Sequence, residues 1–481
     1  MRYPIYTPDI ARYTASAHAC LDAGWVSSQG EYIAKTTKAF EERLGIPYIV
    51  LVNNGTSATH LLYKSLKFKY PCLEHIYVPN NVFVAVWNAG LYEYPASMFH
   101  VLEVDPVTLN MRVGEDYIRE LKPNSAVVVV HNIGNVVDVP RLKKMRPDLV
   151  FVEDACEAFL ERYGDQVTGS ASLCAAVSFF GNKMITSGEG GIWYTHDKEL
   201  YEFIYKSCHH GMTSERYVYD VLGYNYRMTN VQAALLYEQL QAMDAILKRK
   251  RGVADRYKAL FGDAVVTTGL WMMVLRFPGL RYTDILPRLT ALGIDTRPMF
   301  YDLRRHTHLQ GVNCPSKELN TSDVFMIPSS PTLTKFDQVV IENAVQQAIR
   351  GTAVPIVKAT QESLTEFLRN PMPGTFRYFA KRSVEHCLEV HTLTLLAMEG
   401  DVPIGYAHID ERWIGLCVLP HAQSKGVGKA LLTFLLSYAR VVGMPLRLSV
   451  DKNNERAIGL YQRHGFNTVR ESETVYFMEL E

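Results

Sequence analysis

Residues 178–191 of the chain are Ser-Phe-Phe-Gly-Asn-Lys-Met-Ile-Thr-Ser-Gly-Glu-Gly-Gly, and the rest of the sequence is interpreted from this stretch. Its one lysine, Lys183, follows an apolar run, and the glycines after it let the backbone pack closely against a bound group. A lysine that forms an imine must be unprotonated near neutral pH, so it must be partly removed from water. A lysine in a glycine-rich loop can equally be a solvated surface charge, and the upstream segments decide between the two.

Two upstream segments favour a pyridoxal cofactor beside Lys183. The apolar run 149–153 is typical of a buried strand, and Asp154 follows at its carboxyl end, where open α/β sheets bind ligands. A carboxylate there can hold a proton on a pyridine nitrogen. Residues 48–59 predict a strand, a small-residue turn and a helix start, whose N–H groups suit a phosphate. Each feature alone could be an N-cap or a plain turn; their order indicates the cofactor site.

Several motifs together resemble one family. Residues from about 25 to 350 resemble the pyridoxal-phosphate sugar aminotransferases of the DegT/DnrJ/EryC1/StrS family, and within it the perosamine-synthase-like members. The matching segments are 25–30, 54–57, 83–85, 153–158, 178–191, 223–230 and 296–298. The resemblance implies an α/β fold of fold type I, with a large, mostly parallel-sheet domain and a small α/β domain.

The resemblance also implies roles around the cofactor ring. Lys183 would bind pyridoxal 5'-phosphate covalently and shuttle a proton, and Asp154 would pair with the ring nitrogen. Phe83 would stack on the ring. Glu157 would lie near the ring hydroxyl, where many members have a glutamine.

The phosphate and the sugar would be bound by further residues. The resemblance assigns the phosphate to Gly55, Thr56, Ser57 and Ser178. Asn225 would reach the phosphate of a neighbouring subunit, so the active site would need a homodimer. After residue 298 the family often has Pro-Leu-His near the sugar, and this chain has Asp302-Leu303-Arg304 instead.

Length and composition limit the remaining possibilities. A chain of 481 residues is too long for one hydrophobic core. Its 50 basic and 50 acidic residues give no net charge that would attract the whole chain to nucleic acid or to a membrane. No segment approaches the roughly 18 apolar residues of a membrane span, and the start lacks the apolar region of a signal peptide. We therefore expect a cytoplasmic protein without nucleic-acid or membrane partners.

Cysteine and histidine spacing gives no sign of a metal site. The 8 cysteines are scattered singly, which is typical of reduced residues in a cytoplasmic protein. Two histidine pairs could suggest a metal site: His209 with His210, and His306 with His308. Neither pair has a third ligand at the spacing that is typical of metal sites. We expect these histidines to lie in solvated loops.

Alternating patterns indicate the domain organisation. Strand-length apolar runs alternate with helical patterns, which predicts a mostly parallel sheet covered on both faces. We expect a pyridoxal-phosphate-binding large domain at 1–240, a small aminotransferase domain at 241–351 and a further domain at 352–481. A long amphipathic helix is predicted from 230 to 246, and a strand is predicted at 271–277.

The last 130 or so residues carry a second set of motifs. Strand runs at 392–398, 404–409 and 413–419 predict an antiparallel meander. The glycine turn 423–431 then opens an apolar helix, whose start can bind a pyrophosphate. Together with the segment 449–466, these features resemble the GNAT acetyltransferases. The resemblance implies a C-terminal GNAT α/β domain that uses acetyl-CoA.

The GNAT resemblance implies residue roles as well. Asn454 would bind the cofactor, and Tyr461 would protonate the departing thiolate. Backbone groups and side chains of two segments would hold acetyl-CoA: Cys417, Val418 and Leu419, and Gln423, Lys425, Gly426, Val427, Gly428, Lys429 and Ala430.

A base must remove a proton from the acceptor amine. His408 in the second strand of the meander is the favoured candidate, and His391 and Glu411 are the alternatives. Each of the three can also be a structural residue.

The two activities predict a sequential reaction. We expect a bifunctional enzyme that converts a nucleotide-diphosphate 4-keto-6-deoxy sugar and glutamate into the 4-amino sugar, and then uses acetyl-CoA to form the 4-acetamido-4,6-dideoxy sugar. Alternatively, the GNAT domain acetylates a protein or a polyamine, or the chain is an inactive sensor. A dehydratase of the same fold is a third alternative, but such relatives carry histidine at the position of Lys183.

Overall fold

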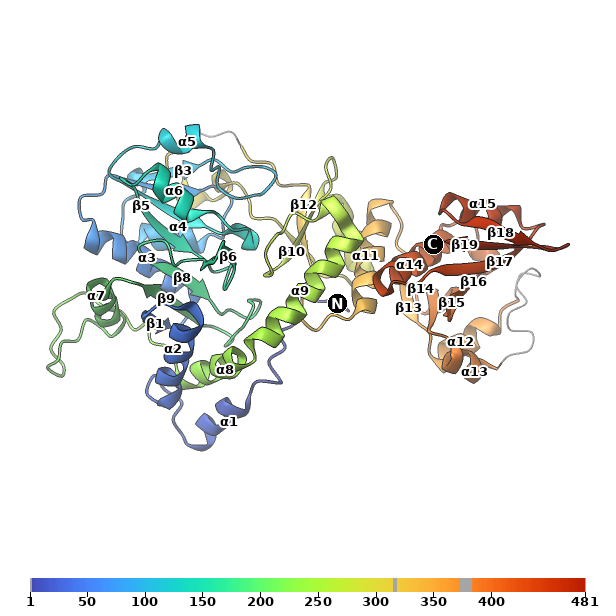
Figure 1. Ribbon diagram of the computed structural model, residues 1–481, viewed down its shortest axis with the longest axis horizontal. Coiled ribbons are helices and arrows are strands. Elements are labelled where there is room, and N and C mark those ends of the chain that lie inside the picture. The colour runs from blue at the N-terminus through green and yellow to red at the C-terminus, as the bar shows by residue number, and fades with distance from the viewer. Residues whose placement is uncertain (1, 315–317, 372–382, 481) are drawn as a thin grey trace.

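The computed structural model describes residues 2–314, 318–371 and 383–480, which form three lobes in a row (Figure 1). The middle lobe lies between the other two, and the N-terminus lies beside it (Figure 1). None of the helices in these ranges has the length and apolar character needed to cross a membrane.

The first lobe is built on a seven-stranded sheet with the order β1-β9-β8-β5-β4-β2-β3. Its strands are β1 (Tyr48–Val52), β2 (His75–Pro79), β3 (Phe99–Leu102), β4 (Ser125–Val130), β5 (Val150–Asp154), β8 (Ala175–Ser178) and β9 (Gly191–Thr195). All neighbours pair in parallel except β9, which is antiparallel to β1 and to β8. The predicted mostly parallel sheet is confirmed, and its parallel strands end at one edge.

Helices cover both faces of this sheet, because side chains of successive strand residues point to opposite faces. Val50 and Val52 share one apolar core with helices on the first face, and Ile49 and Leu51 share another core on the second face. The first face is covered by α3 (Gly55–Lys69), α4 (Ala85–Leu91) and α7 (Lys198–Cys208). The second face is covered by α2 (Glu31–Leu44), α5 (Glu115–Arg119), α6 (Val139–Met145) and α8 (Asn230–Gln241). Minor elements are α1 (Ala15–Asp22), β6 (Arg162–Tyr163) and β7 (Gln166–Val167).

The middle lobe has a three-stranded sheet with the order β10-β12-β11. Its elements are α9 (Met243–Phe261), β10 (Met273–Arg276), α10 (Tyr282–Ala291), β11 (Arg297–Pro298), β12 (Val324–Ile327) and α11 (Lys335–Ile349).

The single helix predicted from 230 to 246 is wrong. The chain breaks at Ala242, whose φ of −96° and ψ of 10° are not helical, and α9 then continues to Phe261. The start of α9 still packs in the first-lobe core, where Met243 and Ile246 join Leu236 of α8, and α9 reaches the core of the middle lobe only from Val253 onward. The apolar residues on both sides of Ala242 face one core, so their pattern could not show the break at that residue.

The third lobe has a seven-stranded sheet with the order β13-β14-β15-β16-β17-β19-β18. Its elements are β13 (Ile356–Lys358), α12 (Gln361–Leu368), α13 (Val384–Val390), β14 (Leu393–Glu399), β15 (Val402–Asp410), β16 (Trp413–Val418), α14 (Val427–Val442), β17 (Leu446–Asp451), α15 (Glu455–Arg463), β18 (Asn467–Glu471) and β19 (Val475–Leu480). Strands β14, β15 and β16 form the predicted antiparallel meander. Parallel strands β16 and β17 pair at only one position in the described chain, Trp413 with Arg447, so they diverge beyond it.

Helix α11 joins the middle and third lobes into one apolar core. Its residue Val345 and residue Leu431 of α14 belong to the same buried cluster, and Phe336 packs 5.5 Å from Phe434 between ring centroids. Polar groups at this contact are paired, because the Ser437 hydroxyl donates to Oε2 of Glu342 at 2.8 Å. The third lobe is therefore packed against the middle lobe and is not held by a linker alone.

Glu342 gives a test of this contact. Burial raises the pKa of Glu342 from 4.5 to about 7, against the lowering effects of Ser437, Arg440 and Arg350. Between these values the folded chain keeps a proton that the unfolded chain has released, so stability falls as the pH rises through this window. We expect Glu342→Gln to remove this fall, which amounts to about 3 kcal/mol between pH 4.5 and pH 8.

The measurement is chemical denaturation of the wild type and the variant at both pH values, with the exposed Glu362→Gln as the matched control. An equal pH dependence in wild type and Glu342→Gln would show that the carboxyl is not buried as described.

Candidate active sites

A cavity of about 870 Å³ lies at the carboxyl edge of the first sheet, where the middle lobe faces it. Eight residues predicted for the pyridoxal site line this one cavity: Gly55, Thr56, Ser57, Phe83, Asp154, Glu157, Ser178 and Lys183. They come from β1, β2, β5 and β8 and the segments after them, which are far apart in the sequence. The shared edge of the sheet brings them together.

The start of α3 fits a phosphate. Asn54 caps the helix, because its Oδ1 accepts the N–H of Ser57 at 2.8 Å. The Ser57 hydroxyl donates to Oδ1 of Asn53 at 2.8 Å, so it would have to turn away from Asn53 to donate to a phosphate oxygen. A Cβ at Gly55 would lie 2.5 Å from Cβ of Ser178, so only glycine lets Ser178 close this side. A 15-residue helix with hydroxyls at its start suits a dianion.

Asp154 is oriented by two hydrogen bonds at the end of β5. Its Oδ2 accepts the hydroxyl of Thr59 at 2.9 Å, and its Oδ1 accepts the N–H of Cys156 at 3.0 Å. The carboxylate is 4% exposed and lines the cavity. These contacts suit a carboxylate that holds a proton on a pyridine nitrogen.

Lys183 and Glu157 lie close together in the cavity. The Nζ of Lys183 lies 3.9 Å from Oε1 of Glu157 and 4.2 Å from the ring centroid of Trp271. The N–H of Ile133 donates to Oε2 of Glu157 at 2.7 Å. Burial raises the pKa of Glu157 to about 7, and Lys183 and the Ile133 N–H oppose this rise. Unlike a glutamine, this group can exchange a proton near neutral pH.

Phe83 and Asn225 occupy different surroundings. Phe83 is 55% exposed at the cavity, and its ring centroid lies 5.9 Å from that of Phe300 in the middle lobe. Asn225 lies outside the lining, exposed on the loop between α7 and α8.

The structure also brings unexpected residues into this cavity. Trp271 begins the predicted strand, but β10 starts at Met273, and the indole of Trp271 faces Lys183 instead. His306 was expected in a solvated loop and lines the cavity. Arg304 turns to Oδ2 of Asp302 at 2.8 Å. The order of residue types carried no signal for Trp271, because its role depends on contact with a distant lobe.

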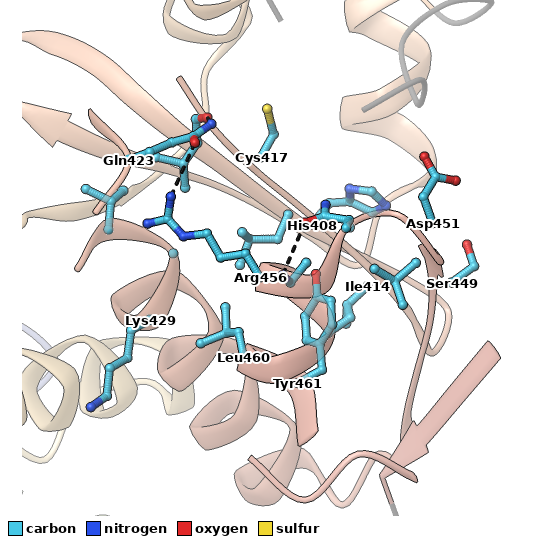
Figure 2. Close-up of a pocket in the computed structure, with 18 of the residues that line it drawn as sticks. His408, Ile414, Cys417, Gln423, Lys429, Ser449, Asp451, Arg456, Leu460 and Tyr461 are labelled. Atoms are coloured by element: carbon cyan, nitrogen blue, oxygen red, sulfur yellow. Dashed lines mark hydrogen bonds between the residues drawn. The ribbon is translucent and has the colours of Figure 1, made fainter. Parts of the chain in front are cut away.

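A second cavity of about 820 Å³ lies where β16 and β17 diverge in the third lobe (Figure 2). Predicted residues that line it are Cys417, Val418, Gln423, Gly426, Val427, Gly428, Lys429, Asn454, Tyr461 and His408. His391 and Glu411 do not line it, so His408 is the one base candidate that reaches this cavity among the described residues.

Three predicted cofactor contacts are placed elsewhere. Lys425 does not line the cavity, and its Nζ lies 3.8 Å from Oε1 of Glu399. The N–H of Leu419 donates to the carbonyl of Ile404 at 3.0 Å, and the N–H of Ala430 donates to the carbonyl of Gly426 at 3.0 Å. Because backbone groups alternate along a strand, the N–H of Val418 points to the open edge instead.

Arg456 of α15 is a further residue at the glycine turn. Its Nη2 donates to the hydroxyl of Ser424 at 3.0 Å, and its Nη1 donates to Oε1 of Gln423 at 3.4 Å (Figure 2). A guanidinium at this turn suits a pyrophosphate. Asn454 caps α15, since its Oδ1 accepts the N–H of Ala457 at 3.1 Å. No feature of the residue order distinguishes Arg456 from its charged neighbours.

Tyr461 and His408 lie in the same cavity (Figure 2). Burial, with a smaller effect of Cys417, raises the pKa of Tyr461 to about 12, so the phenol stays protonated and can donate. His408 is 2% exposed and stacks on His391 with ring centroids 4.4 Å apart. A Cβ at Gly415 would lie 2.1 Å from Cε1 of His408, so only a glycine at this position leaves room for the imidazole ring.

The first site and its sheet define the class of protein. A mostly parallel sheet that carries a lysine, a strand-end carboxylate and a capped helix start at one edge is that of a pyridoxal-phosphate enzyme of fold type I. The chain belongs to the DegT/DnrJ/EryC1/StrS aminotransferase family, whose profile matches residues 9–346. Residues 359–466 match the GNAT acetyltransferase family, so the third lobe is a GNAT domain. The first family uses pyridoxal phosphate, and GNAT domains use acetyl-CoA.

Several known proteins are similar to the aminotransferase part. A GDP-perosamine synthase of Escherichia coli O157:H7 is 33% identical over 315 residues, which cover 63% of this chain and 85% of the relative. A GDP-perosamine synthase of Caulobacter vibrioides is 31% identical over 338 residues, which cover 66% and 90%.

Solved structures share the fold. A GDP-4-keto-6-deoxymannose-3-dehydratase crystallised with GDP-perosamine matches with a TM-score of 0.64 at 19% identity and covers 72% of this chain and 100% of its own. The aminotransferase PseC of Helicobacter pylori, involved in pseudoaminic acid biosynthesis, matches with a TM-score of 0.65 at 20% identity and covers 73% and 100%.

The lysine assignment is tested by Lys183→Ala. We expect this variant to lose the visible absorbance of covalently bound pyridoxal phosphate and all transamination above background, because no other lysine of the described residues lines this cavity. Absorbance spectra and single-turnover rates with an amino donor measure both effects. The exposed Lys198→Ala serves as the matched control and should keep both. A normal visible band in Lys183→Ala would place the cofactor on another residue.

Proposed function

We propose that the chain is a bifunctional enzyme that makes acetylated amino sugars linked to a nucleotide. The aminotransferase unit transfers the amino group of glutamate to C4 of a nucleotide-linked 4-keto-6-deoxy sugar. The GNAT unit then acetylates this amine with acetyl-CoA. The observation that carries the proposal is that one chain holds both lined cavities, since the first reaction creates the amine that the second consumes.

The relatives support a sugar nucleotide as the substrate class. Two of them are named GDP-perosamine synthases, and a protein of the same fold binds GDP-perosamine. In this chain the middle lobe contributes Arg297, Tyr301 and His306 to the first cavity. A guanidinium and hydrogen-bonding side chains suit a diphosphate and sugar hydroxyls.

The residues of the first cavity divide the work of transamination. Bound pyridoxal phosphate would supply a ring that withdraws electrons from the carbon that bears the amino group of glutamate. The ε-amine of Lys183 would take the proton from that carbon and deliver it to the carbon of the cofactor, and Glu157 lies 3.9 Å from this amine to exchange a proton with it. Asp154 would hold the proton of the ring nitrogen, while Thr56 and Ser178 would hold the phosphate.

The residues of the second cavity balance the protons of acetyl transfer. The nitrogen of the amine forms a bond to the acetyl carbon, and the bond from that carbon to sulfur breaks. Tyr461 gives its proton to the sulfur, and His408 accepts the proton that leaves the nitrogen. Both side chains line one cavity, and Arg456 and Lys429 line it as well (Figure 2).

A second copy of the chain completes the first site in this proposal. Large apolar side chains are exposed on the segment between α1 and α2, Trp25 at 61%, and on the loop that carries Asn225, Tyr217 at 70% and Leu222 at 77%. Burying such side chains favours association of two copies. Asn225, which is exposed outside its own cavity, would then reach the phosphate of the partner.

The experiment is a mass-spectrometric assay with pyridoxal phosphate, glutamate, acetyl-CoA and a panel of GDP-, dTDP- and UDP-linked 4-keto-6-deoxy sugars. We expect one substrate to gain an amine, and then an acetyl group only when acetyl-CoA is present. Tyr461→Phe should keep amination and slow acetylation by about 10- to 100-fold, because the thiolate then leaves without a proton.

Tyr438→Phe on α14, outside the second cavity, is the matched control and should change neither step. Amination without acetylation in the wild type would show that the GNAT domain acts on another amine. No amination of any sugar, in protein that shows the bound cofactor, would contradict the proposed substrate class.

A further inference from the structure

Lys250 is a lysine buried in the middle lobe, and it does not itself line either cavity. It lies on α9, is 2% exposed, and donates hydrogen bonds of 2.8 Å to the carbonyls of Trp271 and Ser329. Its Nζ also lies 5.1 Å from the ring centroid of Tyr6. Burial lowers the pKa of Lys250 to about 7, and Glu161 opposes this shift. Neither hydrogen-bond acceptor is a carboxylate, so the side chain connects backbone segments.

Two residues that touch Lys250 also hold the peptide units beside Lys183. The indole Nε1 of Trp271 donates to the carbonyl of Asn182 at 3.1 Å, and its ring faces Nζ of Lys183 at 4.2 Å. The hydroxyl of Tyr6 donates to the carbonyl of Lys183 at 3.0 Å. The carbonyls of two consecutive residues, 182 and 183, are thus bound from outside the first lobe.

Ser329 ties the same arrangement to the N-terminal segment. Its hydroxyl accepts the N–H of Met273 at 2.8 Å, and its N–H donates to the carbonyl of Ile5 at 3.0 Å. Lys250 therefore binds the backbone of Trp271 directly, and it binds the backbone of Ser329, which in turn holds the residue before Tyr6. Movement of Lys250 would move the indole that faces the reactive amine.

We propose that Lys250 is a positioning residue for Lys183 and acts through Trp271 and Tyr6. This inference deepens the proposed transamination, because it names the contacts that fix the reactive amine beside Glu157. An apolar residue of similar length could fill the same space, and replacing buried charge by apolar side chains is often neutral or stabilising. A lysine is needed only if the two carbonyls must be held in place.

The main variant is Lys250→Met, which keeps the length and removes the donors. The exposed Lys248→Met on the same helix is the matched control. Two readouts are measured on protein loaded with pyridoxal phosphate: visible circular dichroism per bound cofactor, which reports ring orientation, and the single-turnover rate constant with saturating glutamate. We expect Lys250→Met to change the dichroism and to slow the reaction by about tenfold or more, because small displacements of reacting groups are costly.

A double variant tests the route of the effect. If Lys250 acts through Trp271, the rate penalties of Lys250→Met and Trp271→Phe are not additive, and the double variant is about as slow as the slower single variant. Additive penalties, or a Lys250→Met protein that matches Lys248→Met in both readouts, would overturn the inference.

Two further outcomes distinguish the role of Lys250 from the proposed function. If Lys250→Met does not fold, Tyr6→Phe and Trp271→Phe are compared instead: non-additive penalties support coupling through Lys250, and additive penalties contradict it. Wild-type protein that binds pyridoxal phosphate without a visible band would contradict the proposed function itself, whereas equal behaviour of the two methionine variants would contradict only the role of Lys250.

Discussion

The burial of helix α11 on two sides is the contact on which the arrangement of the whole chain depends. One side completes the core of the middle lobe, and the other packs on α14 of the GNAT domain. Separating the lobes would expose apolar residues and leave Glu342 and Ser437 without each other. The middle lobe also supplies Trp271 and Arg297 to the first cavity, so the same lobe completes that cavity and packs against the GNAT domain.

The aminotransferase site depends on a topological constraint. Parallel strands end at one edge, so the turn after β1, Asp154 after β5 and Lys183 after β8 must meet there. This is why their order in the sequence predicted a common site, although the turn and the lysine are well over 100 residues apart. Apolar periodicity also predicted the mostly parallel sheet and the C-terminal meander. These predictions succeeded because the pattern of each strand depends on residues that are close together in the sequence.

Features that depend on contacts between lobes could not be predicted in this way. Trp271 has the composition of a strand residue, and only the packing of two lobes turns its ring toward Lys183. The break at Ala242 has no glycine or proline to mark it, and the apolar residues on both sides of it pack in one core. Lys425 fits a phosphate motif by sequence, yet its side chain points to Glu399, since residue order does not fix side-chain direction.

A bifunctional enzyme of this kind passes one molecule of sugar nucleotide through both reactions. The most direct measurement supplies ¹⁵N-glutamate and acetyl-CoA labelled with ¹³C in its acetyl group to the full chain, and weighs the product by mass spectrometry. We expect one sugar nucleotide that carries both labels, and we expect no such product from Lys183→Ala or without acetyl-CoA. A product with ¹⁵N alone, while ¹³C appears on another amine, would contradict the proposed pair of sequential reactions.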